Sequence, residues 1–368
     1  MAVIDALGYP IVVDSGALDR LPALVHDHAR AHRYAVVTDE NVAPHYLGGV
    51  RDALATLAGW DRVHEVVIPA GERYKTREQW ASITDSLLAL GCARDTAVIA
   101  LGGGVIGDLA GFVAATYMRG VPVVQVPTTL LAMVDASVGG KTAVDTPAGK
   151  NTVGAFHPPA LVIIDPCTLA SLPVRELRAG LAEVIKHGVI ADGDELNRVA
   201  SLGSALDAAG AIAADRGLES LIERSVRIKA AVVAADEREL GLRKVLNFGH
   251  TIGHGVEAAS DYALLHGEAV AIGMVAEARL AERVAVAETG TAAAIEQAVS
   301  AAGLPARLPP GTDPARVLKL VQSDKKRRHG ALEYALPLRI GAMAGESTGW
   351  AIPIPNGEVE AVLRDLTS

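Results

Sequence analysis

The chain has 368 residues, which predicts two domains or one large one, since a domain typically takes about 100–200 residues. Its 34 Lys and Arg residues and 43 Asp and Glu residues give a formal net charge of −9. This balance argues against nucleic acid as the main partner, because proteins that bind nucleic acid usually carry a basic surplus. It does not argue against a small anionic ligand, because a binding site depends on local charge.

The cysteine count and the distribution of apolar residues indicate where in the cell the protein is expected. Cys92 and Cys167 are too few for a disulfide framework or a cysteine-based zinc site, and we expect Cys167 to be a buried core residue rather than a reactive thiol. The first residues lack the basic and apolar segments of a signal peptide, and no run approaches about 18 uncharged apolar residues. We therefore expect a soluble cytoplasmic protein with no membrane partner.

The first half of the chain alternates short β-branched runs with helical segments, such as the amphipathic stretch at 76–90. Strands are predicted at 34–38, 63–69, 96–101, 122–127 and 161–165. This alternation is typical of a mostly parallel sheet with helices on both faces.

After about residue 166 the pattern changes to Ala- and Leu-rich segments with helical spacing. Helices are predicted at 174–191, 194–214, 215–238, 249–259 and 267–287, and a short strand-like stretch lies near 332–341. We therefore expect an α/β domain over residues 1–166 and a mainly helical domain over 167–368.

A glycine-rich motif, GGGVIGD at 102–108, follows a predicted strand and begins a helical stretch. It contains the G-x-G-x-x-G spacing of dinucleotide-binding turns, where glycines let the backbone approach a pyrophosphate and the helix N-terminus favours negative charge. The acidic residue usual about 20 positions later is missing, so a ribose-binding acid would come from elsewhere, for which Asp39 is a candidate. A purely structural strand–helix turn is the alternative.

A second glycine-rich segment, 134–151, carries the sequence GGKT at 139–142. A phosphate-binding P-loop is excluded, because its first glycine would fall on Asp135. Lys141 and Lys150, which we expect in glycine-flanked turns with Asn151 beside them, remain suited to phosphate binding. Two exposed lysines are the alternative interpretation.

Two later segments carry metal-binding residue types. Glu183, Lys186 and His187 share one helical face, although an ordinary ion pair would have the same spacing. Three of the 11 histidines, His250, His254 and His266, fall within 17 positions. Neutral imidazoles four residues apart are good zinc ligands, and a carboxylate could complete the site. Spacing leaves open which histidines bind, and the simplest pair is His250 with His254.

Taken together, these motifs resemble those of the 3-dehydroquinate synthase family of sugar phosphate cyclases. The resemblance runs from about residue 38 to 326 and includes, in order, GExxK (71–75), GGGVIGD, ATYMRG (115–120), SVGGKT (137–142), AGLAEVIKHG (179–188), NFGHTIGH (247–254) and HGEAVAIGM (266–274). It implies a Rossmann-like α/β domain that binds NAD, a mainly α-helical domain that binds a divalent metal ion, Zn²⁺ or Co²⁺, and a homodimer.

The resemblance also assigns residues. It implies that Glu183, His250 and His266 bind the metal, in place of the simple histidine pair, and that His254, Glu239 and Lys141 are catalytic. NAD contacts are implied for Asp39, Glu72, Lys75, Gly103, Gly104, Val105, Asp108, Thr128, Thr129, Lys150, Thr168 and Ser171. Substrate contacts are implied for Arg119, Asp135, Lys141, Asn151, Lys186, Lys229, Arg243, Asn247 and one of Lys325 and Lys326.

The implied reaction converts 3-deoxy-D-arabino-heptulosonate 7-phosphate to 3-dehydroquinate and phosphate in the shikimate pathway, with NAD regenerated in each turnover. The alternatives are another sugar phosphate cyclase, of the amino-dehydroquinate, 2-deoxy-scyllo-inosose or 2-epi-5-epi-valiolone type, a metal-dependent polyol dehydrogenase, or a non-catalytic binding protein. Ala143, Asp145 and Glu333 depart from the commonest family pattern.

Overall fold

The structure, a computed structural model, describes residues 1–147, 149–203, 216–261, 263–325 and 332–367. The chain forms two compact units. Unit 1 comprises Met1–Leu172 with Ala209–Ala230, and unit 2 comprises Pro173–Ala208 with Ala231–Ser368. The domain limits expected from the sequence, 1–166 and 167–368, stay a prediction.

Unit 1 is an α/β unit built on a seven-stranded sheet and a separate hairpin. Its strands are β1 (Ala2–Ile4), β2 (Ile11–Val13), β3 (Arg33–Asp39), β4 (Val63–Ile68), β5 (Thr96–Gly102), β6 (Val123–Pro127), β7 (Lys141–Thr146), β8 (Gly149–Phe156) and β9 (Leu161–Ile164). Its main helices are α1 (Leu21–His28), α2 (Ala43–Ala58), α3 (Arg77–Ala89) and α4 (Gly104–Thr116).

The large sheet has the strand order β1-β2-β9-β6-β5-β3-β4. All its neighbouring strands are parallel except β1 and β2. The chain passes from β3 outward to β4 and then returns to β5 on the other side of β3, so the order reverses between β3 and β5. In parallel sheets, ligands bind in the crevice outside the carboxyl ends of the strands at such a reversal.

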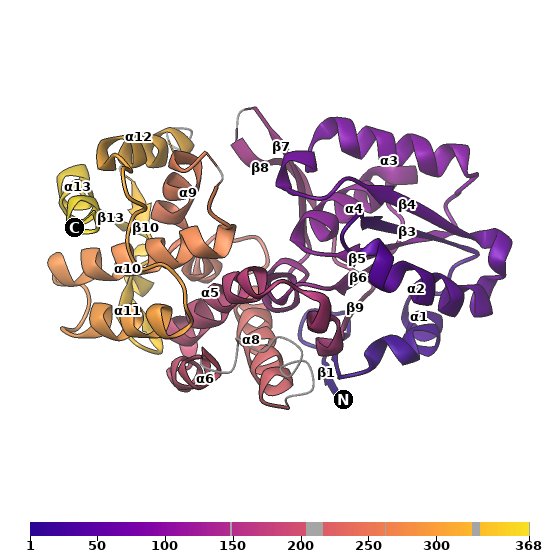
Figure 1. Cartoon of the computed structure of the whole chain (residues 1–368), viewed down its shortest axis with the longest axis horizontal. Coiled ribbons are helices and arrows are strands. Elements are labelled where there is room, and N and C mark those ends of the chain that lie inside the picture. The colour runs from indigo at the N-terminus through magenta and orange to yellow at the C-terminus, as the bar shows by residue number, and fades with distance from the viewer. Residues whose placement is uncertain (148, 204–215, 262, 326–331, 368) are drawn as a thin grey trace. The chain divides into compact units, whose positions relative to one another are not determined.

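Alternate strand residues form two separate cores, one on each face of this sheet. Tyr34 and Val36 pack with α1 and α2, whereas Ala35 and Val37 pack with α3 and α4. Figure 1 shows these two helix pairs on opposite faces of the sheet. The strands read as continuous apolar runs because both faces are covered.

All five predicted strands of the first half are present, each within one residue of its expected ends. One expectation is wrong: Lys141 and Lys150 do not lie in turns. They belong to β7 and β8, which pair antiparallel from Lys141 opposite Phe156 to Thr146 opposite Gly149. This polar, glycine-rich hairpin shows no clear alternation of apolar and polar residues, so its strands were not recognised in the sequence.

Unit 2 is mainly helical. Its helices are α5 (Val174–Ala191), α6 (Asp194–Gly203), α9 (His250–Ala259), α10 (His266–Arg283), α11 (Thr291–Ala301), α12 (Pro314–Lys325) and α13 (Asn356–Asp365), and α8 (Arg216–Ala235) contributes residues to both units. Its short strands are β10 (Glu333–Tyr334), β11 (Pro337–Arg339), β12 (Ala342–Met343) and β13 (Ile352–Pro353). The predicted fold class, an α/β unit plus a mainly helical one, is confirmed.

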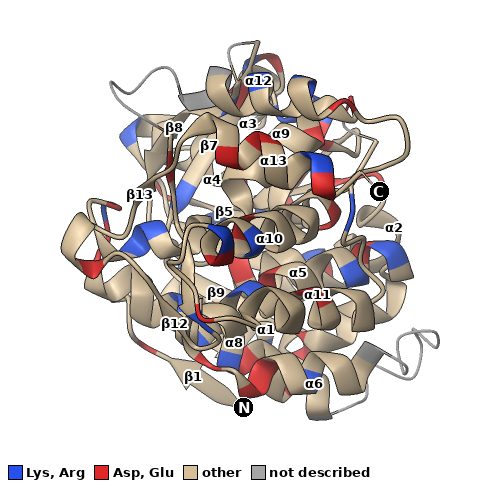
Figure 2. Cartoon of the chain, turned by 90° about the vertical axis from the view of Figure 1, so that its left-hand side faces the viewer, with Lys and Arg blue, Asp and Glu red and all other residues tan. Residues whose placement is uncertain are grey.

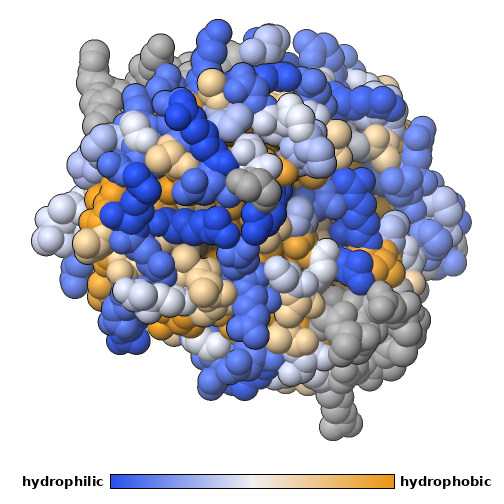
Figure 3. Space-filling view, turned by 60° about the vertical axis from the view of Figure 1, so that its left-hand side comes forward, coloured by the Kyte–Doolittle hydropathy of each residue, from blue (hydrophilic) through white to orange (hydrophobic). Residues whose placement is uncertain are grey.

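Helix α10 forms the centre of unit 2, packed against α5, α9, α11 and α13. Almost every residue from Gly267 to Ala281 is buried, as expected for a helix surrounded by others. Figure 2 shows basic and acidic residues interspersed on the helices that face the viewer, and Figure 3 shows a largely hydrophilic face with separate hydrophobic areas. No helix in the described ranges is long and apolar enough to cross a membrane.

Cys167 is exposed, contrary to the expectation of a core residue. It lies in the short helical turn Pro166–Ser171, where its backbone N–H donates to Oδ1 of Asp165 at 3.0 Å. Partial burial and the neighbouring Asp165 carboxylate raise the pKa of the Cys167 thiol. A raised pKa keeps the thiol protonated and therefore weakly nucleophilic.

Candidate nucleotide-binding turn and metal centre

The glycine motif lies at the carboxyl end of β5, beside the point where the strand order reverses. Gly103 precedes the first residue of α4, Gly104, and has no side chain with which to cap the helix. Val105 lies in the first turn of α4, whose backbone N–H groups have no partner within the helix. The turn therefore presents N–H donors and the positive end of a helix dipole, which suit a pyrophosphate.

Asp39 ends β3, the strand next to β5. Its Oδ1 accepts hydrogen bonds from the backbone N–H groups of Asn41 at 2.9 Å and Val42 at 3.1 Å. These bonds orient the carboxylate just before α2. The structure thus places the candidate ribose-binding acid on the strand adjacent to the glycine turn.

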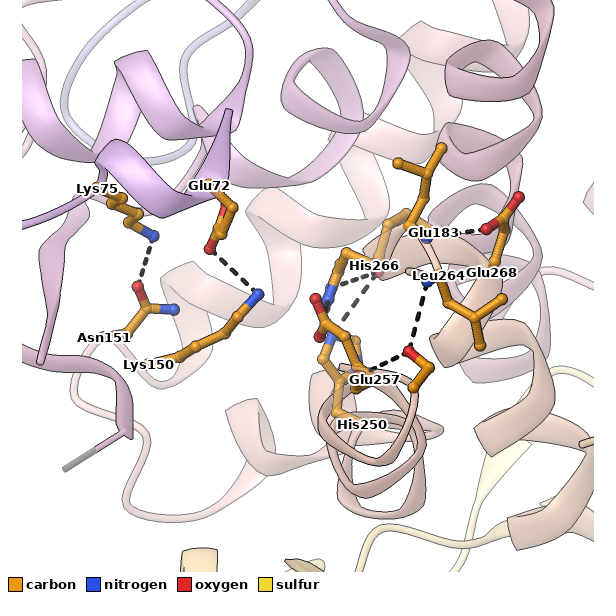
Figure 4. A network of polar contacts seen from close by, with 12 residues as sticks. Glu72, Lys75, Lys150, Asn151, Glu183, His250, Glu257, Leu264, His266 and Glu268 are labelled. Atoms are coloured by element: carbon orange, nitrogen blue, oxygen red, sulfur yellow. Dashed lines mark hydrogen bonds and ion pairs between the residues drawn. The ribbon is translucent and has the colours of Figure 1, made fainter. Parts of the chain in front are cut away.

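A buried lysine contacts two other expected NAD- or substrate-binding residues of unit 1. Nζ of Lys75 lies 2.5 Å from both Oδ2 of Asp108 and Oδ1 of Asn151, and the Lys75 side chain is only 4% exposed. Burial disfavours the charged ammonium, but Asp108 and Glu72 outweigh it and raise the pKa of Lys75. Nearby, Nζ of Lys150 lies 3.2 Å from Oε1 of Glu72 (Figure 4).

Thr168 and Ser171, two of the residues expected to contact NAD, lie against Tyr46, which sequence reasoning missed. The hydroxyl of Tyr46 donates to the carbonyl of Thr168 at 2.8 Å and lies 2.7 Å from Oγ of Ser171. At the carboxyl end of β6, the N–H of Thr128 donates to the carbonyl of Gly102, and Thr129 follows directly. Tyr46 belongs to α2 and left no motif in the sequence.

Asp135, which is partly buried, and the buried Lys229 form a second charge pair in unit 1. Asp135 lies in a π-helical turn, Ala132–Ala136, in which the N–H of Ser137 donates to the carbonyl of Ala132. Nζ of Lys229 contacts both the carbonyl oxygen of Asp135 at 2.5 Å and its Oδ1 at 2.8 Å. Single π-helical turns occur frequently at functional sites.

Two other expected substrate-binding residues are exposed. Arg119 has a left-handed backbone conformation with φ of 69°, and Met118 before it has φ of 49°. Adjacent non-glycine residues in this region indicate local strain, which proteins retain mainly at functional sites. Lys141 is the exposed first residue of β7.

In unit 2, two histidines and a glutamate turn toward one another. Nε2 of His250 lies 3.6 Å, and Nε2 of His266 lies 3.8 Å, from Oε1 of the fully buried Glu183 (Figure 4). Ligands about 2 Å from a tetrahedral ion would be about 3.3 Å apart. The observed separations are only slightly wider than that.

The opposite ring nitrogens of these histidines have partners of their own. Nδ1 of His250 lies 3.2 Å from the carbonyl oxygen of Phe248, and Nδ1 of His266 lies 3.4 Å from Oε2 of Glu257. Because a carbonyl can only accept, Nδ1 of His250 is the donor of this hydrogen bond, and Nε2 is the ring nitrogen directed at Glu183. Metal-binding histidines are characteristically oriented by such a carbonyl or carboxylate. Glu257 is a further residue that sequence reasoning missed.

His254 lies with the other two histidines, its ring centroid 5.4 Å from that of His250 and 5.7 Å from that of His266. One nitrogen from each of the three histidines lies within 4.8 Å of the others. His250 and His266 each approach Oε1 of Glu183 within 4 Å. The geometry is compatible with Glu183, His250 and His266, the ligand set that the resemblance implies, with His254 one helical turn from His250.

Glu183 itself fits a cation. Both of its carboxylate oxygens are buried, and among the described residues neither accepts a hydrogen bond of ordinary geometry. Nζ of Lys186 is in ion-pair contact with Oε2. A buried carboxylate that is not satisfied by hydrogen bonds, facing two imidazole nitrogens, has the donor set that Zn²⁺ and Co²⁺ prefer.

Two glycines bring the three helices close enough for this set to form. A Cβ on Gly267, next to His266, would lie 1.9 Å from the carbonyl oxygen of Ala179 on α5. A Cβ on Gly273 of α10 would lie 1.9 Å from the carbonyl oxygen of Gly249, next to His250. Neither position can accept a side chain unless the helices separate.

Glu239 and Asn247 lie in the loop between α8 and α9, which is held by hydrogen bonds to Asp236. Asp236 accepts hydrogen bonds from the backbone N–H groups of Leu240, Gly241 and Arg243, which outweigh partial desolvation and lower the pKa of Asp236. Nδ2 of Asn247 donates to Oε1 of Glu239 at 2.6 Å. Asp236 therefore holds the backbone of this loop in place.

Arg243 is 2% exposed, and its guanidinium donates to the carbonyl of Glu237 at 2.6 Å. Lys325 ends α12, but its side chain and the whole of Lys326 lie outside the described residues.

Comparison with known proteins decides the family. Residues 65–179 match the model "3-dehydroquinate synthase N-terminal", and residues 180–327 match "3-dehydroquinate synthase C-terminal". A 3-dehydroquinate synthase of Symbiobacterium thermophilum is 50% identical over 336 residues, which cover 90% of this chain and 92% of that protein. The chain belongs to the 3-dehydroquinate synthase family. The resemblance noted in the sequence is thereby confirmed.

Solved structures of other sugar phosphate cyclases share the fold of this family member. A 2-epi-5-epi-valiolone synthase of Streptomyces hygroscopicus, with NAD⁺ and Zn²⁺ bound, superposes with a TM-score of 0.86 at 30% identity and covers 100% of this chain and 98% of its own. A 2-deoxy-scyllo-inosose synthase in complex with carbaglucose-6-phosphate, NAD⁺ and Co²⁺ gives 0.85 at 27% identity, with 97% and 96% covered. The curated relatives do not favour these activities for this chain.

Proposed function

We propose that this chain converts 3-deoxy-D-arabino-heptulosonate 7-phosphate to 3-dehydroquinate and phosphate, using NAD and one divalent metal ion. The observation that carries the metal requirement is the convergence of His250 and His266 on the buried Glu183. When bound, NAD supplies a reversible hydride acceptor and the metal ion supplies Lewis-acid polarisation of the sugar oxygens. The two groups account for a reaction with no net change in oxidation state.

The residues of unit 1 are proposed to bind the nucleotide. Gly103, Gly104 and Val105 would receive the pyrophosphate at the start of α4, and Asp39 would bind a ribose hydroxyl. The charged Lys75 holds Asp108 in place, and Glu72, Lys150, Thr128, Thr129, Thr168 and Ser171 would complete the pocket. These assignments follow the family pattern and the placement of the turn at the sheet's reversal.

The cationic residues are proposed to bind the two anionic ends of the substrate. Arg243 presents a planar guanidinium from a buried position, which suits the substrate carboxylate. Lys229 and Asn247 are proposed to have the same role. Lys141, Arg119, Asn151 and a lysine at 325 or 326 would bind the phosphate, whose charge needs several cations. Lys186 would help to offset the negative charge of Glu183, and Asp135 would position Lys229.

Proton transfers are proposed for His254 and Glu239. His254 lies beside the candidate metal ligands and would hold or donate a proton at the sugar oxygens. Glu239 is held by the Asn247 amide in a left-handed backbone conformation with φ of 59°. Loss of the phosphate by elimination needs removal of a proton from the carbon next to the transient ketone. The leaving phosphate can itself accept this proton, so the protein need only position the substrate.

The test is release of inorganic phosphate from the heptulosonate phosphate by the purified protein. We expect activity that a strong chelator abolishes and that Zn²⁺ or Co²⁺ restores. Parallel assays with the amino analogue, glucose 6-phosphate and sedoheptulose 7-phosphate separate this reaction from those of the other cyclases. Net accumulation of NADH without phosphate release would instead identify a polyol dehydrogenase, and full activity in the chelator would refute the metal requirement.

The choice between Zn²⁺ and Co²⁺, assembly as a homodimer and a cytoplasmic location are also proposed. The two cyclases described above hold one or the other metal. Metal analysis of the purified protein and its mass in solution test the first two.

A further inference from the structure

A carboxylate on α10 replaces the local capping that the first turn of α9 lacks. Oε2 of Glu277 accepts from the N–H of Gly249 at 2.7 Å, and Oε1 accepts from the N–H of Ile252 at 2.9 Å. These are the N-cap and third residues of α9, the two N–H groups that a capping box satisfies. Gly249 and Ile252 have no polar side chains to do so, and Glu277 is fully buried.

One of these bonds acts on the peptide group that orients a candidate metal ligand. The N–H of Gly249 and the carbonyl of Phe248 belong to the same peptide plane. Glu277 accepts from its N–H, and Nδ1 of His250 donates to its carbonyl at 3.2 Å. A peptide polarised by a carboxylate on its N–H side is a stronger acceptor on its carbonyl side.

We propose that Glu277 is a positioning residue for the metal centre, which acts on His250 through the Phe248–Gly249 peptide. It fixes the plane whose carbonyl orients the imidazole, and it makes Nε2 of His250 a more basic ligand. The proposal rests on His250 binding a metal ion, as in the proposed function. It makes Glu277 an outer partner of the site that acts through the backbone rather than as a metal ligand.

The same helix provides a matched control. Glu282 of α10 accepts from the N–H of Ala292 at 2.8 Å in the first turn of α11. Both α9 and α11 begin after a glycine in the left-handed conformation, Gly249 with φ of 80° and Gly290 with φ of 95°. Each carboxylate thus caps a neighbouring helix, but α11 carries no candidate ligand.

The experiment measures metal affinity of full-length wild type, E277Q and E282Q by competition with a chromogenic chelator. Removing an outer-shell partner typically weakens metal binding about 10–100-fold. We expect a loss in that range for E277Q, with a changed visible spectrum of the Co²⁺ form, and none for E282Q. Circular dichroism and thermal unfolding of the metal-free proteins report any general loss of structure.

Wild-type affinity and an unchanged Co²⁺ spectrum in folded E277Q would overturn the proposal, as would an equal loss in E282Q. If E277Q does not fold, E277D keeps the charge and can still reach one N–H. We then expect a smaller but measurable loss of affinity and a shifted spectrum, and wild-type values would refute the proposal. Failure of the wild type to bind any metal would instead refute the proposed function on which this inference rests.

Discussion

The two units build their candidate sites in different ways. In unit 1 the turn after β5 presents backbone N–H groups at a strand end, and this turn is formed by a strand and a helix that are consecutive in sequence. In unit 2 the metal centre combines side chains from three helices, α5, α9 and α10, which are distant in sequence. A site of the first kind tolerates small helix movements, whereas one of the second kind depends on helix-to-helix distances near the packing limit.

The comparison is tested most directly by replacing two histidines. We expect H266A to weaken metal binding by more than about 100-fold, beyond the loss typical of an outer partner, and to abolish phosphate release. H254A should keep the metal and lower turnover by about 10²–10⁴-fold, as the loss of a general acid or base does. Metal content and steady-state rates distinguish the two, and the reverse pattern would make His250 and His254 the ligand pair.

In unit 1 the largest expected effect is on stability, at the buried Lys75. K75M leaves the Asp108 carboxylate without its ammonium partner, and we expect a loss of about 3 kcal/mol in the free energy of unfolding. K150M is the matched control, because its pair with Glu72 is partly exposed and such pairs contribute about 0–1 kcal/mol. Urea unfolding measures both, and equal losses would contradict the distinction between the buried and exposed pairs.

The dependence of unit 2 on close helix packing is tested at Gly267. G267A places a Cβ against the carbonyl of Ala179, so we expect a loss of about 1–3 kcal/mol from overpacking together with weaker metal binding. G357A is the control, because a Cβ there meets nothing within 4 Å. If G267A binds metal as tightly as the wild type, the α5–α10 distance does not govern the centre.

The smallest expected effect concerns pH. The folded-state pKa of Asp236 is lowered, chiefly by three backbone N–H groups acting against desolvation. Its contribution to stability is therefore present above the unfolded pKa, about 3.9, and is lost as pH falls through the lower folded value. We expect D236N to be less stable than the wild type at pH 6, and the difference in unfolding free energy should shrink toward pH 2. A constant difference would exclude the ionised carboxylate as its cause.

The sequence predicted the parts that local pattern determines. The apolar strand runs and the glycine turn of unit 1 are local signals, and they are present as expected. In unit 2 the spacing of His250 and His254 suggested these two as the simplest ligand pair, because a helix places residues four apart on one face, whereas the facing residues on α5 and α10 leave no local trace. Both Glu183 and His266 were candidates from residue type, but only the resemblance to the family combined them with His250 in one ligand set.

The residues that sequence reasoning missed all act across elements. Glu257, Glu277 and Tyr46 work through contacts to backbone or side chains of other segments. Pairing between β7 and β8 was hidden for the same reason, since hairpin pairing in a polar segment depends on tertiary packing. Asp236 is the exception, because acidic residues before a glycine-containing turn often cap nearby N–H groups.

Because Asp135 lies in the π-helical turn Ala132–Ala136, its position depends on how many residues this turn contains as well as on which residues they are. A π turn corresponds to an ordinary helical turn that has gained one residue. Deleting one residue there would restore regular spacing and rotate Asp135 by about 100° relative to the segment before it. Its carbonyl would turn away from Lys229, although every side chain named in the proposed site would still be present. A single-residue gap in an aligned relative at this turn therefore marks a changed substrate site more surely than a conservative substitution at Asp135.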